Sequence, residues 1–328
     1  MQIKITDTGK NNQVGIASTA DGAANLSVQI IGNHNHLVIG PGARLAGLIE
    51  SAACQLRLRR NFLGPVWQRG RAFAKYVSIR IQSKRNITRP GASTPVLVLG
   101  MSHVQAIDRA LTAAERQVIS VIDLNAAPDL FNKTANRINL GLLPVAGVTH
   151  VFLSIRGNDH NILGLIESPL PVRIGDGPMG SIPADPGRHF IPEDMMRSLM
   201  RARLEDQSFG LMQDLARHFS AATICQLASP PPCGDAAHIA KFPGIFRSLL
   251  HQGVSPMPLR RKIYDLHTEL YQAACQKLGI GFIRPPQVAV APDGAMKAEY
   301  WNSDPTHGNA AYGRLVIDQI VATAGVSM

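Results

Sequence analysis

The sequence lacks any apolar run long enough to cross a bilayer, and its first thirteen residues, MQIKITDTGKNNQ, lack the apolar stretch of a secretory signal. Both absences favour a cytoplasmic location. Cysteine is scarce, with four residues in 328, and no two of them form a C-x-x-C pair. We therefore expect buried thiols and no metal site, and no motif calls for a cofactor.

Acidic residues are missing from one segment, residues 57–89, which contains ten Lys and Arg residues. This segment accounts for the whole net charge of +10, because the other basic residues are matched in number by acidic ones. A local basic strip can bind an anionic surface or an acidic polymer, and it can equally be a solvated linker. Specific nucleic-acid binding is not expected. Aromatic residues interleave with the basic ones, which keeps a peripheral membrane location open.

Composition divides the chain into three regions. Residues 1–56 are rich in Gly and Asn, and the segment "LSVQIIGNHNHLVIG" predicts a strand, a turn and a second strand, a pattern similar to a β-solenoid coil. So small a β-rich extension cannot bury much core alone, so we expect it to pack on the remainder of the chain or on another copy in a homo-oligomer. Residues 57–93 form the basic linker or helix, and residues 94–328 the third region.

The third region alternates short apolar runs with helical patterns. The runs are "VLVLG", "VISVIDL", "VTHVFLSIRG", "ATICQLA" and "IGFI". Strands that are apolar throughout are typical of a parallel sheet covered by helices on both faces. The fold class is therefore α/β, with a three-layer α/β/α arrangement and the flavodoxin-like strand order 2-1-3-4-5.

Candidate catalytic residues stand at the predicted strand ends, where open α/β sheets bind ligands. Ser102 follows the first strand and Asn158 the third, and the strand order makes these two strands neighbours. Ser102 alone could be a helix N-cap or a nucleophile. Asp304 and His307 stand three apart, at the expected start of the last helix. At that spacing the carboxylate can hold Nδ1 of the imidazole while Nε2 accepts the serine proton. We do not expect His103 to be this base, because adjacent residues point in different directions.

Three segments carry a family resemblance. "GMSH", "GND" and "DPTHGN" resemble the first, third and fifth sequence blocks of the SGNH (GDSL-type) hydrolases, over about residues 95–328. Met101 and His103 depart from the G-D-S-L wording of the first block. The resemblance implies a flavodoxin-like fold with Ser102 as the nucleophile, His307 as the base and Asp304 orienting the histidine.

The resemblance also implies an oxyanion hole and a substrate-binding loop. The backbone N–H of Ser102 and the side-chain amide of Asn158 would be two of the oxyanion donors. The family's third donor is a glycine after the second strand, where this chain has no glycine and Ala126 is the candidate. Around the third block, the candidate substrate-binding residues are Arg156, Gly157 and Asp159.

A Pro- and Gly-rich insertion, residues 163–194, follows the third strand and is predicted to form a lid or substrate wall. Arg156 or Arg173 would be available there for an acidic group of the substrate.

Three functions stay open from the sequence. The first is a serine esterase that hydrolyses an acyl ester, of a small molecule or a glycan, through an acyl-serine intermediate. The second is an O-acyltransferase that passes the same acyl group to an acceptor hydroxyl. The third is a non-catalytic protein of binding or assembly that uses residues 57–89 to bind an anionic polymer.

Overall fold

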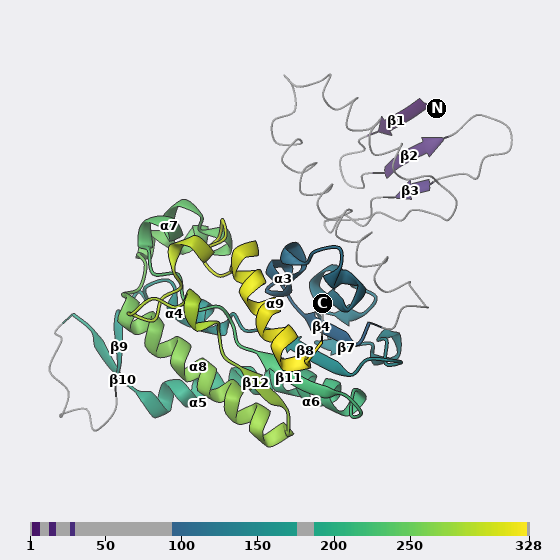
Figure 1. The fold of residues 1–328 in the computed structure, drawn as a ribbon. Coiled ribbons are helices and arrows are strands. Elements are labelled where there is room, and N and C mark those ends of the chain that lie inside the picture. Colours follow the sequence, from purple (N-terminus) through teal and green to yellow (C-terminus); the bar gives the residue numbers. More distant parts are fainter. Residues whose placement is uncertain (1, 7–12, 18–26, 30–93, 176–186, 327–328) are drawn as a thin grey trace. The chain divides into compact units, whose positions relative to one another are not determined.

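The computed structural model describes residues 2–6, 13–17, 27–29, 94–175 and 187–326 (Figure 1). The chain divides into two compact units, Met1–Ala74 and Lys75–Met328. In the first unit an antiparallel sheet has the order β1-β2-β3, with β1 Gln2–Thr6, β2 Gln13–Ala17 and β3 Ser27–Gln29. The predicted strand after "GNHN" and the basic segment lie outside the described residues. The division at residues 56 and 93 stays a prediction.

The second unit is built on a five-stranded parallel sheet with the order β12-β11-β8-β4-β5. Counted along the chain, this is the order 2-1-3-4-5, so the predicted topology is confirmed. Each apolar run forms a strand: β4 Val96–Gly100, β5 Ile119–Asp123, β8 His150–Ser154, β11 Thr223–Leu227 and β12 Gly281–Ile283.

Helices cover both faces of this sheet (Figure 1). They are α3 Val104–Ala110, α4 Asp159–Gly164, α5 Glu193–Leu204, α6 Gly210–His218, α7 Ala236–Lys241, α8 Met257–Leu278 and α9 Ala310–Ala324. Alternate residues of β4 enter separate cores: Val96 and Val98 pack with residues of α3 and α9, whereas Leu97 and Leu99 pack with residues of α5, α6 and α8. All four side chains are fully buried, which explains why the strand is apolar throughout.

Helices α3 and α9 are in close contact beside the site. A Cβ atom on Gly313 of α9 would lie 2.0 Å from the backbone oxygen of Ala106 on α3, so only glycine fits there. This contact fixes α9, and with it the loop that precedes α9, against the helix that follows β4.

Two small sheets lie outside the five-stranded sheet in the described part of this unit. The hairpin β6 Phe131–Asn132 and β7 Arg137–Ile138 follows β5. The insertion predicted as a lid contains a two-stranded parallel sheet of β9 Val172–Gly175 and β10 His189–Pro192, and residues 176–186 between them are outside the described part. Among the described residues, no helix is both long and apolar enough to cross a membrane.

Candidate active site

Ser102 lies just beyond β4, in the turn that leads into α3. The N-cap position of α3 is occupied by His103, and no side chain caps the helix. The Ser102 hydroxyl instead lies 2.8 Å from Nε2 of His307, which is 205 positions away in the sequence. Ser102 is therefore no helix cap, and its hydroxyl is hydrogen-bonded to an imidazole.

His307 and Asp304 belong to a tight turn. Asp304 Oδ1 lies 2.8 Å from His307 Nδ1 and accepts the backbone N–H groups of His307 and Thr306, each at 2.9 Å. The Asn302 amide donates to the other carboxylate oxygen at 2.7 Å. The carboxylate thus closes the turn and holds the imidazole at the same time.

This turn is not helical, which corrects one expectation. Helix α9 begins at Ala310, and its N-cap is Asn309, whose side chain accepts the backbone N–H of Tyr312. Asp304 and His307 therefore precede the helix rather than start it, and Asp304 does not cap it. The three-residue spacing works here because the carboxylate accepts the backbone N–H groups of its own turn.

The charge state of Asp304 sets the tautomer of His307. Partial burial alone would raise the pKa of this carboxyl, but hydrogen bonds from His307, Thr306 and Asn302 outweigh it and hold the pKa well below its usual range. An ionised carboxylate only accepts hydrogen bonds, so Nδ1 of His307 carries the proton. Nε2 then presents its lone pair to the Ser102 hydroxyl.

Asn158 follows β8, the strand that neighbours β4 in the sheet. In that pairing Gly100 is opposite Ser154, so the two strands end at the same edge of the sheet. Asn158 Oδ1 accepts a hydrogen bond of 2.8 Å from Nδ2 of Asn161, and its side chain does not cap α4. This contact fixes the amide so that Nδ2 is the end that can donate to a ligand.

Gly157 makes a close approach that defines the wall of the site. Its φ angle is +97°, and a Cβ atom there would lie 2.3 Å from Ser229 Oγ and 3.5 Å from His103 Cδ2. Ser229 and His103 thus lie against Gly157, and Ser229 is a residue that the sequence did not single out. Ser229 lies just beyond β11, so the rule that ligands bind at strand ends would have found it.

Two residues predicted to contact substrate have partners within the protein. Arg156, at a φ angle of +58°, donates from Nη2 to Asn136 Oδ1 at 2.9 Å. Asp159 is 3% exposed and forms an ion pair with Arg203. Both side chains thus make contacts within the fold, and the substrate-binding role of Arg156, Gly157 and Asp159 stays a prediction.

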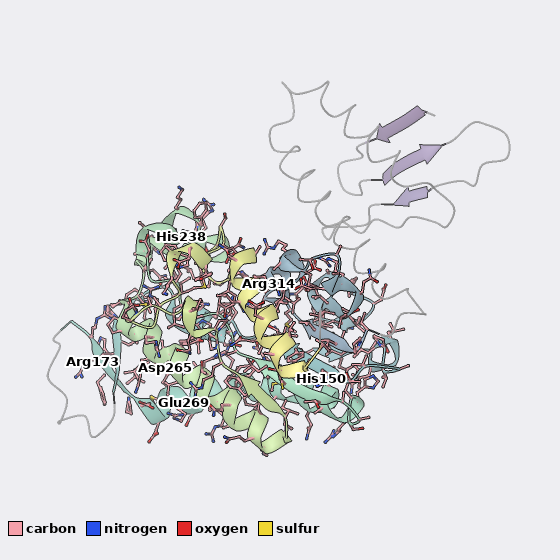
Figure 2. All side chains as sticks on the ribbon, viewed as in Figure 1. His150, Arg173, His238, Asp265, Glu269 and Arg314 are labelled. Carbon is pink, nitrogen blue, oxygen red and sulfur yellow. The ribbon has the colours of Figure 1, made fainter. Side chains whose placement is uncertain are left out.

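Two further candidates were Ala126 and Arg173. Ala126 ends the short 3-10 helix η2, Leu124–Ala126, directly after β5, and it is buried. Its role as an oxyanion donor stays a prediction. Arg173, on β9, lies over the ring of Phe190 on β10 at 5.1 Å, so its guanidinium is engaged in a cation–π contact (Figure 2).

Three buried histidines, His103, His160 and His267, lie near the proposed catalytic residues or near one another. The rings of His103 and His307 are 4.8 Å apart between centroids, and those of His160 and His267 are 5.1 Å apart. Neither ring nitrogen of His103 has a hydrogen-bond partner among the described residues. Burial lowers the pKa of all three buried histidines, to about 3 for His267, so they are neutral at pH 7.

No group of three or more His, Cys, Asp or Glu side chains is arranged to hold a metal ion in the part of the chain that the structure describes. Cys225, Cys233 and Cys275 are buried free thiols, and Cys54 lies outside the described residues.

The buried histidines predict a loss of stability in acid. Their pKa values in the folded state lie below the ordinary 6.5, so the unfolded chain binds more protons once the pH falls below 6.5. Above pH 6.5 these histidines cost the folded state nothing. Below it, the free energy of unfolding decreases by roughly 1.4 kcal/mol per histidine for each unit by which the pH is lowered. Urea unfolding between pH 7 and pH 5 should show a shallower decline for His267→Phe than for the wild type. The exposed His251→Ala control should keep the wild-type slope, and an unchanged slope in His267→Phe would contradict the account.

The chain is distantly similar to several solved structures. No family model and no curated protein matches the chain. A GDSL-like lipase from Bacteroides thetaiotaomicron is 14% identical, with 76% of this chain and 99% of that chain covered and a TM-score of 0.38. The periplasmic domain of a lipopolysaccharide acetyltransferase from Salmonella ser. Paratyphi A is 11% identical, with 81% and 98% covered and a TM-score of 0.43. An extracellular lipase from Streptomyces rimosus is 12% identical, with 70% and 98% covered and a TM-score of 0.41. Likenesses at this level carry no information on activity or substrate.

Proposed function

We propose that this protein is a serine esterase that hydrolyses an acyl ester through an acyl-serine intermediate. The observation that carries the proposal is the unbroken hydrogen-bonded chain from Ser102 Oγ to His307 Nε2 and from His307 Nδ1 to Asp304, with both contacts at 2.8 Å. A serine hydroxyl becomes a competent nucleophile when a base of this kind takes its proton.

The reaction follows from these contacts. Ser102 Oγ attacks the acyl carbonyl carbon as His307 Nε2 takes the hydroxyl proton, and Asp304 stabilises the resulting imidazolium. His307 then gives the proton to the departing alcohol oxygen, which leaves the acyl group on Ser102. Water, deprotonated by His307, then attacks this ester, and the acid is released as Ser102 Oγ takes the proton back from His307. The N–H of Ser102 and the Asn158 amide, with Ala126 as the third candidate, would stabilise the oxyanion in both steps.

The oxyanion role predicts the effect of removing the Asn158 amide. In Asn158→Ala we expect kcat to fall by roughly 10²- to 10³-fold, because the negative charge on the transition-state oxygen loses one donor. KM should change little, since the neutral ground-state carbonyl gains less from that donor. Steady-state kinetics on a p-nitrophenyl ester would measure both constants. Asn132→Ala, an exposed asparagine on β6, is the control, and equal kcat values in the two variants would remove Asn158 from the reaction.

The function itself is tested with a panel of p-nitrophenyl esters and acetylated sugars. Release of p-nitrophenol or acetate by the wild-type protein supports the proposal, and inertness towards the whole panel would contradict it. The same acyl-serine would also serve acyl transfer. Adding an acceptor sugar therefore decides between the two reactions, since hydrolysis yields free acid and transfer yields a new ester.

A further inference from the structure

A segment next to the site, residues 236–252, is tied to the turn that holds Asp304. We call it the site-flanking segment; it consists of α7 and the 3-10 helix η6, Gly244–Gln252. The His238 ring, on α7 (Figure 2), makes a 2.9 Å hydrogen bond from Nε2 to the backbone oxygen of Asn302. The same ring lies 4.8 Å from that of Trp301. Because the Asn302 amide donates to Asp304, two successive hydrogen bonds connect the segment to a proposed catalytic residue.

Helix η6 itself adjoins this turn. A Cβ atom on Gly244 would lie 3.7 Å from Cδ of Pro305, the residue after Asp304. Phe246 is buried and anchors η6 to a small apolar cluster. Ile245 and Leu249 are instead 77% and 42% exposed. Two large aliphatic side chains therefore face water beside the proposed active site.

The charged residues of the segment itself are all basic. No Asp or Glu occurs from residue 236 to residue 264. Lys241 and Arg247 are exposed and enter no ion pair with any described residue. Exposed aliphatic side chains also occur on α5, at Met195 and Leu199, but Glu193 and Asp194 begin that helix. In the site-flanking segment, by contrast, exposed aliphatic side chains occur together with basic residues alone.

We propose that Ile245, Leu249, Lys241 and Arg247 form a docking surface for an anionic lipid bilayer. Aliphatic side chains gain free energy by entering the acyl-chain boundary, and Lys and Arg are attracted to anionic headgroups. Docking through η6 would hold the turn of Asp304 and His307 close to the membrane. If the proposed function also holds, its substrate is a lipid ester presented by that membrane, and this last step rests on the proposed function.

Vesicle binding by the full-length protein tests the surface. We expect the wild type to co-sediment with vesicles of phosphatidylglycerol and phosphatidylcholine more than with pure phosphatidylcholine. In the double variant Ile245→Ser/Leu249→Ser, partition onto the anionic vesicles should fall roughly tenfold. The matched control, Met195→Ser/Leu199→Ser, should bind like the wild type. Absence of wild-type binding, or equal binding of both double variants, would overturn the proposal.

A second experiment measures whether residue 245 itself enters the bilayer. Binding of vesicles by other basic parts of the chain does not affect this result. In Ile245→Trp, brominated lipid should quench more tryptophan fluorescence than in Met195→Trp, against the shared background of Trp67 and Trp301. Equal quenching would overturn the proposal. So would light scattering that shows the wild type to be an oligomer and Ile245→Ser/Leu249→Ser a monomer, because a second copy would then cover the patch. Hydrolysis of a soluble ester should be the same in wild type and double variant, so failure of the esterase and failure of the docking surface are separable.

Discussion

Replacing Ser102 with alanine is expected to lower kcat on a p-nitrophenyl ester by roughly 10⁴- to 10⁶-fold, to the level left by binding and the oxyanion donors alone. The hydroxyl is hydrogen-bonded to Nε2 of His307, and alanine offers no atom to form the acyl intermediate. The substitution removes one oxygen next to the start of α3 and no helix cap, so the thermal midpoint of unfolding should stay close to that of the wild type.

The matched control for this variant is Ser198→Ala, which removes an exposed hydroxyl from α5 and should leave the rate unchanged. A Ser102→Ala enzyme within tenfold of the wild-type rate would mean that another nucleophile does the chemistry.

Asp304→Asn should lower kcat by roughly 10⁴-fold. The neutral amide cannot stabilise the imidazolium of His307, and its NH₂ end competes with Nδ1 as a hydrogen-bond donor, which favours the wrong imidazole tautomer. The effect should fall on kcat rather than on KM, because the imidazolium forms only during the reaction. The variant should also lose most of its response to fluorophosphonate, since Ser102 would no longer be activated.

Asp304 also accepts backbone N–H groups, so its structural share must be measured separately. Asp293→Asn is the matched control, because Asp293 accepts the backbone N–H of Ala295 in another turn and touches no proposed catalytic residue. Urea unfolding of both variants measures how much free energy of unfolding is lost when each aspartate is replaced in its turn. A variant at 304 that retains kcat within tenfold of the wild type would rule out the orienting role.

The sheet was predictable from sequence because its strands are mostly apolar on both faces. Val96, Leu97, Val98 and Leu99 alternate between two separate helical layers, and all four are fully buried. The right-handed crossover rule then left few strand orders, and the observed order is the expected one. Because strand ends collect at one edge, the same reasoning placed Ser102 at the site.

Other features depend on contacts between residues far apart in the chain. Asp159 reads as an open loop residue, yet it pairs with Arg203, 44 positions later. Arg156 likewise reads as a ligand for an anion, and its partner is Asn136 on a different loop. No sequence motif identifies Arg203 or Asn136 as the partner of these residues. The turn before α9 was also misassigned, because Asp304, expected at the start of the helix, stabilises a non-helical turn while Asn309 caps the helix.

The contact of His103 with His307 has a similar cause. Sequence reasoning set His103 aside as a base because it adjoins Ser102, and its ring is in fact buried with neither nitrogen bonded to any described residue. What the sequence could not show is that α9 brings the His307 ring to 4.8 Å from it. A ring contact across 204 positions follows only from the packing of α3 on α9.

The most direct test of the central claim is labelling of the full-length protein with a fluorophosphonate probe, followed by peptide mapping. Fluorophosphonates react with serine hydroxyls that a neighbouring base has activated. The account predicts one labelled peptide in the wild type, modified at Ser102, with no label in Ser102→Ala and strongly reduced label in His307→Ala. An unlabelled wild-type protein, or a label on a serine other than Ser102, would contradict it.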